Sequence, residues 1–108
     1  PQLFQVAATD QQVAAYILGA PAEVSGHIWL MSLLVGSEYR GKGLGAQLIE
    51  YWLNTACQLG YHSVWLTVAP QNTAAIKLYE RFGFTRQQLE QDYLGKGQDR
   101  LIMLRATT

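Results

Sequence analysis

The amino-acid sequence predicts one mixed α/β domain, a central mixed β-sheet flanked by helices in the order β-β-β-α-β-α-β-β. Three observations predict this class. Short β-branched and aromatic runs recur along the chain as expected for strands. Two segments have the hydrophobic period of a helix. Strands alternate with these helices, which requires a right-handed crossover and at least one parallel strand pair. With 108 residues, 49% of them hydrophobic, the chain fits one packed domain.

The first third of the chain contains three predicted strands. Residues 4–8 and 13–18 are expected to form a hairpin, with residues 9–12 as its turn. Residues 19–26 are expected to form a loop because Pro21 and Gly26 interrupt the pattern. Residues 27–35 are apolar almost throughout, which is typical of a strand buried on both faces.

A helix is predicted over residues 44–59, where apolar side chains recur at steps of three and four. Gly60 stands where a helix commonly ends in glycine. Cys57 lies within this helix, and we expect it to pack against its neighbours as a small hydrophobe. It is the only cysteine, so the chain cannot form an internal disulfide.

Strand signals return after the first helix. Residues 63–69 form a predicted strand that Pro70 ends, and Asn72 can cap a second helix that runs to about Phe82, with Gly83 as its stop. Residues 84–87 and 101–104 are two further predicted strands. Hairpins at both ends of the chain imply antiparallel pairs beside the parallel one.

The charge balance argues against two classes of partner. Eight basic and eight acidic residues give a formal net charge of zero, which disfavours broad binding to nucleic acid or to a membrane surface.

We find no long apolar run and no signal-peptide pattern. The single cysteine favours a reducing compartment, and we expect a cytoplasmic protein. No cluster of histidine, cysteine and carboxylate has metal-ligand spacing, so we expect no metal.

The most specific feature is a glycine-rich turn between the predicted third strand and the first helix. Glycines at 41, 43 and 45 leave the backbone bare, so its amides can approach an anion closely, and the helix N-terminus adds partial positive charge. Arg40 and Lys42 add two full charges. A phosphate or pyrophosphate is the natural ligand of such a turn.

Three known motifs were compared with this turn. The P-loop pattern GxxxxGK[ST] fails because Gly43 replaces its hydroxyl residue, and the Rossmann pattern GxGxxG fails on spacing. The pattern [QR]xxGx[GA] matches residues 40–45, RGKGLG, which follow a strand ending at Val35. This hexad resembles the turn of the GNAT superfamily of N-acetyltransferases. Taken alone, it also fits an ordinary strand-to-helix turn with glycines for tight packing.

A second stretch, residues 72–84, resembles the pattern Nxx-A-xx-LY-xx-GF of the same family. Core packing and a glycine stop account for Ile76, Leu78, Phe82 and Gly83 without any functional role. The two motifs together, in the family's order, are much more specific than either one. The resemblance extends from Phe4 to about Leu104, and its specific part spans residues 33–84.

This resemblance implies a GNAT-like acyl-CoA N-acyltransferase fold and the direct transfer of an acetyl group from acetyl-CoA to a primary amine of an unidentified small molecule or peptide. In the family, the turn holds the pyrophosphate, the preceding strand polarises the thioester and the asparagine lies beside the pantetheine arm. Tyr79 corresponds to the general acid, and a phenol suits this role because its pKa of about 10 is near that of a thiol. The implied coenzyme-binding residues are Leu33, Leu34, Val35, Arg40, Gly41, Lys42, Gly43, Leu44, Gly45, Ala46, Asn72, Ala75 and Tyr79.

Two departures from the family pattern leave alternatives open. Several members carry a glutamate on the strand before the turn, but Trp29 stands about there, so His27 becomes the candidate base or else only a polar strand end. Family chains also usually begin with a strand and one or two helices that wall the acceptor site. We therefore expect a single domain over residues 1–108 without those elements. Three explanations for the absence of these elements remain open. They lie in a missing upstream segment, a partner subunit such as that of a homodimer supplies the wall, or the domain is a reduced form of the family. The alternative functions are a non-catalytic acyl-CoA sensor and a fragment that needs a partner.

Overall fold

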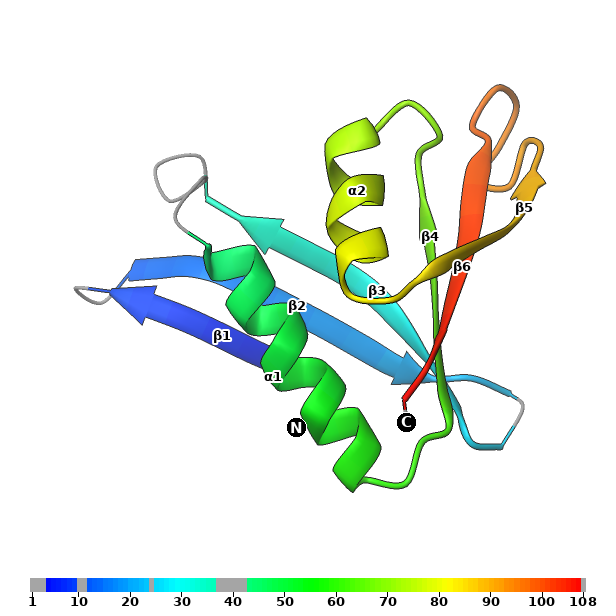
Figure 1. Ribbon diagram of the computed structural model, residues 1–108. Coiled ribbons are helices and arrows are strands. Elements are labelled where there is room, and N and C mark those ends of the chain that lie inside the picture. Colours follow the sequence, from blue (N-terminus) through cyan, green and yellow to red (C-terminus); the bar gives the residue numbers. More distant parts are fainter. Residues whose placement is uncertain (1–3, 10–11, 24, 37–42, 108) are drawn as a thin grey trace.

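The computed structural model describes residues 4–9, 12–23, 25–36 and 43–107, and these build one six-stranded sheet with two helices (Figure 1). The strand order is β1-β2-β3-β4-β6-β5. The elements are β1 (Phe4–Thr9), β2 (Gln12–Pro21), β3 (His27–Val35), α1 (Leu44–Gln58), β4 (Ser63–Val68), α2 (Thr73–Arg81), β5 (Thr85–Glu90) and β6 (Arg100–Ala106).

The predicted element order and mixed sheet are confirmed. β3 and β4 pair in parallel, and the other neighbours pair antiparallel. Gly60 and Gly83 follow the two helices with φ of 92° and 91°, values that favour glycine. The carboxamide oxygen of Asn72 accepts a hydrogen bond of 3.2 Å from the Ala75 amide, as expected of a helix cap.

Four strands are longer than predicted, β1 by the single residue Thr9. β2 continues through Gly19 and Ala20 to Pro21, which were expected to belong to a loop. Pro21 is the last residue of β2 and lies beyond Leu18, where the described pairing of β2 with β1 ends. β5 runs to Glu90 and β6 starts at Arg100, outside the apolar runs that predicted them. The side chains of β5 are mostly exposed because it is an edge strand, so its sequence shows no core pattern.

Both helices pack on the same face of the sheet (Figure 1). The expectation that residues 27–35 are buried on both faces is therefore wrong: Met31 is 59% exposed and Leu34 is 50% exposed. The run shows no alternation of apolar and polar residues because a β-bulge changes which residues of β3 face the core. Ser32 pairs with Leu18 and Leu30 with Gly19, so Met31 is an extra residue that reverses the alternation of β3. The residues of β3 that pack into the helix-side core are Ile28 and Leu30 before the bulge, and Leu33 and Val35 after it.

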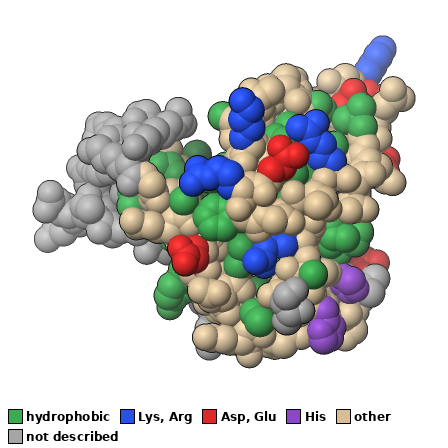
Figure 2. All heavy atoms as spheres, viewed as in Figure 1, with side chains coloured by type: hydrophobic (Ala, Val, Ile, Leu, Met, Phe, Trp, Pro, Cys, Tyr) green, Lys and Arg blue, Asp and Glu red, His purple; other side chains and the backbone are tan. Residues whose placement is uncertain are grey.

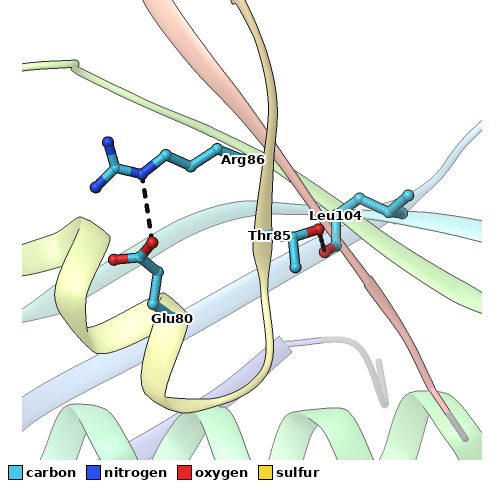
Figure 3. A network of polar contacts seen from close by, with 4 residues as sticks. All are labelled: Glu80, Thr85, Arg86 and Leu104. Atoms are coloured by element: carbon cyan, nitrogen blue, oxygen red, sulfur yellow. Dashed lines mark hydrogen bonds and ion pairs between the residues drawn. The ribbon is translucent and has the colours of Figure 1, made fainter.

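Polar contacts fasten β5 to its neighbours (Figure 3). Arg86 of β5 forms an ion pair of 3.3 Å with Glu80 of α2, and the Thr85 hydroxyl donates to the carbonyl of Leu104 in β6. Both ion-pair side chains are largely exposed, so this pair contributes little to stability. Basic and acidic side chains are interspersed over the face that carries the helices (Figure 2).

Candidate active site

The sheet opens between its two parallel strands. β3 and β4 pair only from His27 to Trp29 and from Ser63 to Trp65, although β3 continues to Val35 and β4 to Val68. Beyond this point β3 keeps its pairing with β2, and β4 keeps its pairing with β6. The diverging strands leave a cleft of about 650 Å³, which the first residues of α1 and one side of α2 also line.

The cleft brings together most of the residues that the sequence predicted for coenzyme binding. Arg40, Gly41 and Lys42 lie outside the described residues. The predicted residues that line the cleft are Leu33, Leu34, Val35, Gly43, Leu44, Gly45, Ala46, Asn72, Ala75 and Tyr79.

One end of the cleft is the N-terminus of α1. Gly43 precedes the helix with φ of 80°, a left-handed conformation that favours glycine, and it provides no side-chain cap. The first N–H groups of a helix lack partners within it, and the first turn of α1 contains no acidic residue. Within the described residues, no atom lies within 4 Å of the position of a Cβ on Gly43. The amides of Leu44, Gly45 and Ala46 thus form an uncapped, electropositive edge of the cleft.

The α2 side of the cleft carries a buried phenol. Tyr79 is 9% exposed, and its ring packs edge-on against Phe84 at a centroid distance of 5.8 Å. Burial raises the pKa of Tyr79 above 10, and the positive charge of Arg100 partly opposes this rise in pKa. The phenol is therefore protonated at neutral pH and can donate a proton into the cleft.

Arg100 is a lining residue that the sequence prediction missed. It begins β6, and its Nε and Nη2 donate to the Thr67 hydroxyl at 3.2 Å and to the Thr67 carbonyl at 3.0 Å. The sequence shows only a single arginine before an apolar strand. Its place beside the cleft depends on β6 pairing with β4, three elements further back along the chain.

Comparison with known proteins identifies the family. A sequence model described as the acetyltransferase (GNAT) family matches residues 1–84, more than half of the chain. An N-acetyltransferase of Methanocaldococcus jannaschii is 34% identical over 109 aligned residues, covering 97% of this chain and 67% of the relative. This chain belongs to the GNAT acetyltransferase family.

Two further GNAT comparisons agree in fold. The ribosomal-protein-S18-alanine N-acetyltransferase of Escherichia coli superposes with a TM-score of 0.82 at 28% identity, covering 94% of this chain and 66% of the enzyme. Arabidopsis thaliana Naa50, solved with the bisubstrate analogue CoA-Ac-MVNAL, gives a TM-score of 0.86 at 23% identity, covering 96% of this chain and 72% of the relative. The chain thus spans about two thirds of the length of these relatives.

His27, the candidate base, does not line the GNAT cleft. It lies at the paired ends of β3 and β4 and lines a separate cavity with Trp29 and Trp65. The Trp65 indole N–H donates to His27 Nδ1 at 3.1 Å, and Nδ1 also contacts the Ser63 hydroxyl. An indole N–H can only donate, so Nδ1 is an acceptor and the proton is on Nε2. The structure separates His27 from Tyr79 and gives it hydrogen-bond partners of its own.

Other expectations concern groups outside the cleft. Cys57 is exposed rather than packed against its neighbours, because Ala56 takes the buried position on α1. Within the described residues, no three histidine, cysteine or carboxylate side chains are grouped to hold a metal ion. No helix in this part of the chain is both long and apolar enough to cross a bilayer.

Proposed function

We propose that the cleft between β3 and β4 binds acetyl-CoA and that the domain transfers the acetyl group directly to a primary amine. One observation carries the proposal: the opening of the sheet places the uncapped N-terminus of α1 and the buried phenol of Tyr79 on the same cavity. The first suits a phosphate, and the second suits an acid that protonates a leaving group.

The pyrophosphate would bind at the N-terminus of α1. Amides of the first turn have no side-chain cap, and Gly43 keeps the approach to them open. Gly45 lies against Val35 and Leu78, with a hypothetical Cβ at 3.6 and 3.9 Å from their side chains. This close packing holds the helix start at the carboxyl end of β3, next to the opening.

The pantetheine arm would occupy the opening itself. The edge of β3 that faces β4 borders the cleft from Leu30 to Leu34, and an extended arm can bond to it as an added strand does. Asn72 caps α2 through its carboxamide oxygen, which leaves the N–H groups of the amide as donors at the cleft. The arm would thereby direct its thioester toward Tyr79.

The chemical step needs a proton donor and a neutral amine. The amine nitrogen attacks the thioester carbon, the C–S bond breaks, and Tyr79 gives its proton to the departing sulfur. The attacking amine must also lose a proton. Among the described lining residues there is no carboxylate and no imidazole, so we assign this proton to water that enters the open cleft. Binding and orientation of the two substrates supply the rest of the rate.

The relatives support a peptide-like acceptor. The Escherichia coli relative acts on an alanine of a ribosomal protein, and the bisubstrate analogue in the Arabidopsis relative joins CoA to a short peptide sequence. We extend this acceptor class, an amine on a peptide or an amino acid, to the present chain.

Calorimetric titration of the chain with acetyl-CoA, desulfo-CoA and dephospho-CoA tests the coenzyme site. We expect one saturable site whose affinity falls when phosphate groups are removed. A thiol-release assay over a panel of amines tests transfer. Binding with no turnover on any amine would indicate a coenzyme-binding module, and a folded chain that does not bind acetyl-CoA would refute the proposal.

A further inference from the structure

Arg100 lines the cleft from the face of the sheet opposite the helices. Strand alternation fixes this side: Leu101 and Met103 of β6 belong to the helix-side core, so Arg100 projects the other way. Thr67 of β4 does the same between the core residues Leu66 and Val68. The Arg100–Thr67 contact therefore forms on the far face, across the sheet from α1.

The two bonds to Thr67 fix one edge of the guanidinium group and leave the other edge open. Nε donates to the Thr67 hydroxyl and Nη2 donates to the Thr67 carbonyl. These two bonds occupy the side edge of the guanidinium group. The end edge keeps one N–H on Nη2 and one on Nη1, and the second N–H of Nη1 points back toward Cδ. The described residues supply no partner for these three N–H groups. The guanidinium group is planar and its orientation is fixed by Thr67. Its free end edge can therefore bind a carboxylate through two parallel hydrogen bonds.

The charge of Arg100 is not balanced by a carboxylate in the described part of the chain. Glu90 is its cross-strand neighbour on β5, but no ion pair joins them, and the Glu90 carboxylate accepts a hydrogen bond from Gln88. Arg100 is only half-buried, yet withdrawing a cation from water without a partner is unfavourable. A ligand anion at this position would supply the missing charge.

Either of the two proposed substrates can supply this anion, the coenzyme through its phosphates and the acceptor through a carboxylate. The phosphate-binding edge of the cleft is the start of α1, which packs beside β3 on the helix face. Arg100 belongs to the other wall, on β6 beside β4, and by strand alternation it projects to the other face. An acceptor that enters the cleft from this face therefore comes into contact with Arg100.

We propose that Arg100 is a specificity-determining residue that selects an acceptor amine carrying a carboxylate, an amino acid or an acidic peptide. This inference rests on the proposed acetyl transfer. Thr67 is the positioning residue that holds the guanidinium group at the cleft.

The test compares matched amines that differ in one carboxylate. The pairs are phenylalanine with phenylalaninamide, and the peptide Ala-Glu-Ala-amide with Ala-Gln-Ala-amide. kcat/KM for each amine is measured in the wild type, in Arg100→Gln and in Arg100→Lys. Comparing the carboxylate-to-amide ratio between proteins cancels the different basicities of the amines. Arg86→Gln is the matched control, since it removes an exposed arginine that does not line the cleft.

We expect Arg100→Gln to lower the carboxylate-to-amide ratio about tenfold for at least one pair, as for the loss of a charge-assisted hydrogen bond. Arg100→Lys should keep part of the preference because it keeps the charge. The affinity for acetyl-CoA should stay unchanged. Thermal melts establish that each variant is folded.

Three outcomes would overturn the inference: an unchanged ratio in folded Arg100→Gln, equal use of both members of each pair by the wild type, or weaker acetyl-CoA binding with the ratio preserved, which would assign Arg100 to the coenzyme. If the wild type transfers no acetyl group, the proposed function fails separately. Saturation-transfer NMR with the two peptides then decides the inference, and binding that is equal or absent refutes it.

Discussion

Gly19 of β2 faces the indole ring of Trp52 so closely that a Cβ on Gly19 would lie 2.2 Å from Trp52 Cζ2. Trp52 belongs to α1 and is fully buried in the hydrophobic core. Gly19 also pairs with Leu30, next to the bulge at Met31. The absence of a side chain at Gly19 thus allows Trp52, the largest fully buried residue, to pack against the sheet where β3 changes its alternation.

Gly19→Ala should destabilise the fold by overpacking this contact. We expect the free energy of unfolding in urea to fall by about 1–3 kcal/mol. Gly45→Ala is the control, since its Cβ would meet Val35 and Leu78 at ordinary contact distances. Equal stability of Gly19→Ala and the wild type would show that Trp52 moves aside without cost.

Gly43→Val should abolish acetyl-CoA binding. The β-branched side chain would project at the uncapped start of α1, and φ of 80° is strained for valine, so stability should fall by about 1–3 kcal/mol as well. Calorimetry at a temperature where the variant is folded measures the affinity. Gly45→Ala should keep both binding and fold, because the motif accepts glycine or alanine at its last position. Full affinity in folded Gly43→Val would refute the phosphate site.

Tyr79→Phe should lower kcat about 100-fold while leaving acetyl-CoA affinity unchanged, because it removes a proton donor and nothing else. The ring and its edge-on contact with Phe84 are kept, so the thermal midpoint should not fall. Steady-state thiol release and calorimetry on the same preparations measure both quantities. Wild-type turnover in the variant would remove Tyr79 from the mechanism.

The titration of Tyr79 gives an independent check. Burial raises its pKa, so the difference absorbance at 295 nm between the wild type and Tyr79→Phe should titrate with a midpoint above 10. The raised pKa means that the folded state favours the neutral phenol over the phenolate. Its contribution to stability is therefore complete below pH 10 and is lost as pH rises through the folded pKa. Arg100→Gln should move the midpoint higher still, and a midpoint below 10 would contradict the burial of the phenol.

His27→Ala should affect stability and not catalysis. It leaves the Trp65 indole N–H and the Ser63 hydroxyl without their partner, which should cost about 1–3 kcal/mol in urea unfolding. kcat should stay at the wild-type value because His27 lines a different cavity from Tyr79. A large fall in kcat with unchanged stability would restore His27 as the base.

The predictions from sequence that the structure bears out are those with a local cause. Residues 72–83 illustrate this: Asn72 caps α2 and Gly83 follows it in a left-handed conformation, and each depends on neighbours within a few residues. The extent of β2 and β5 was missed because Pro21 and the polar residues of β5 join strands through pairing with distant partners. Met31 looked like a core residue because a bulge cannot be read from an apolar run.

The sequence by itself determined the family, the order of the elements and the glycine-rich turn at the start of α1, since these follow from short motifs and local conformational preferences. Only the tertiary structure decided where β3 and β4 separate, that Tyr79 is buried at a cleft that Arg100 also lines, and that His27 belongs to another cavity. The physical reason is that strand register and the side on which a residue lies are set by pairing and packing between segments far apart in the chain.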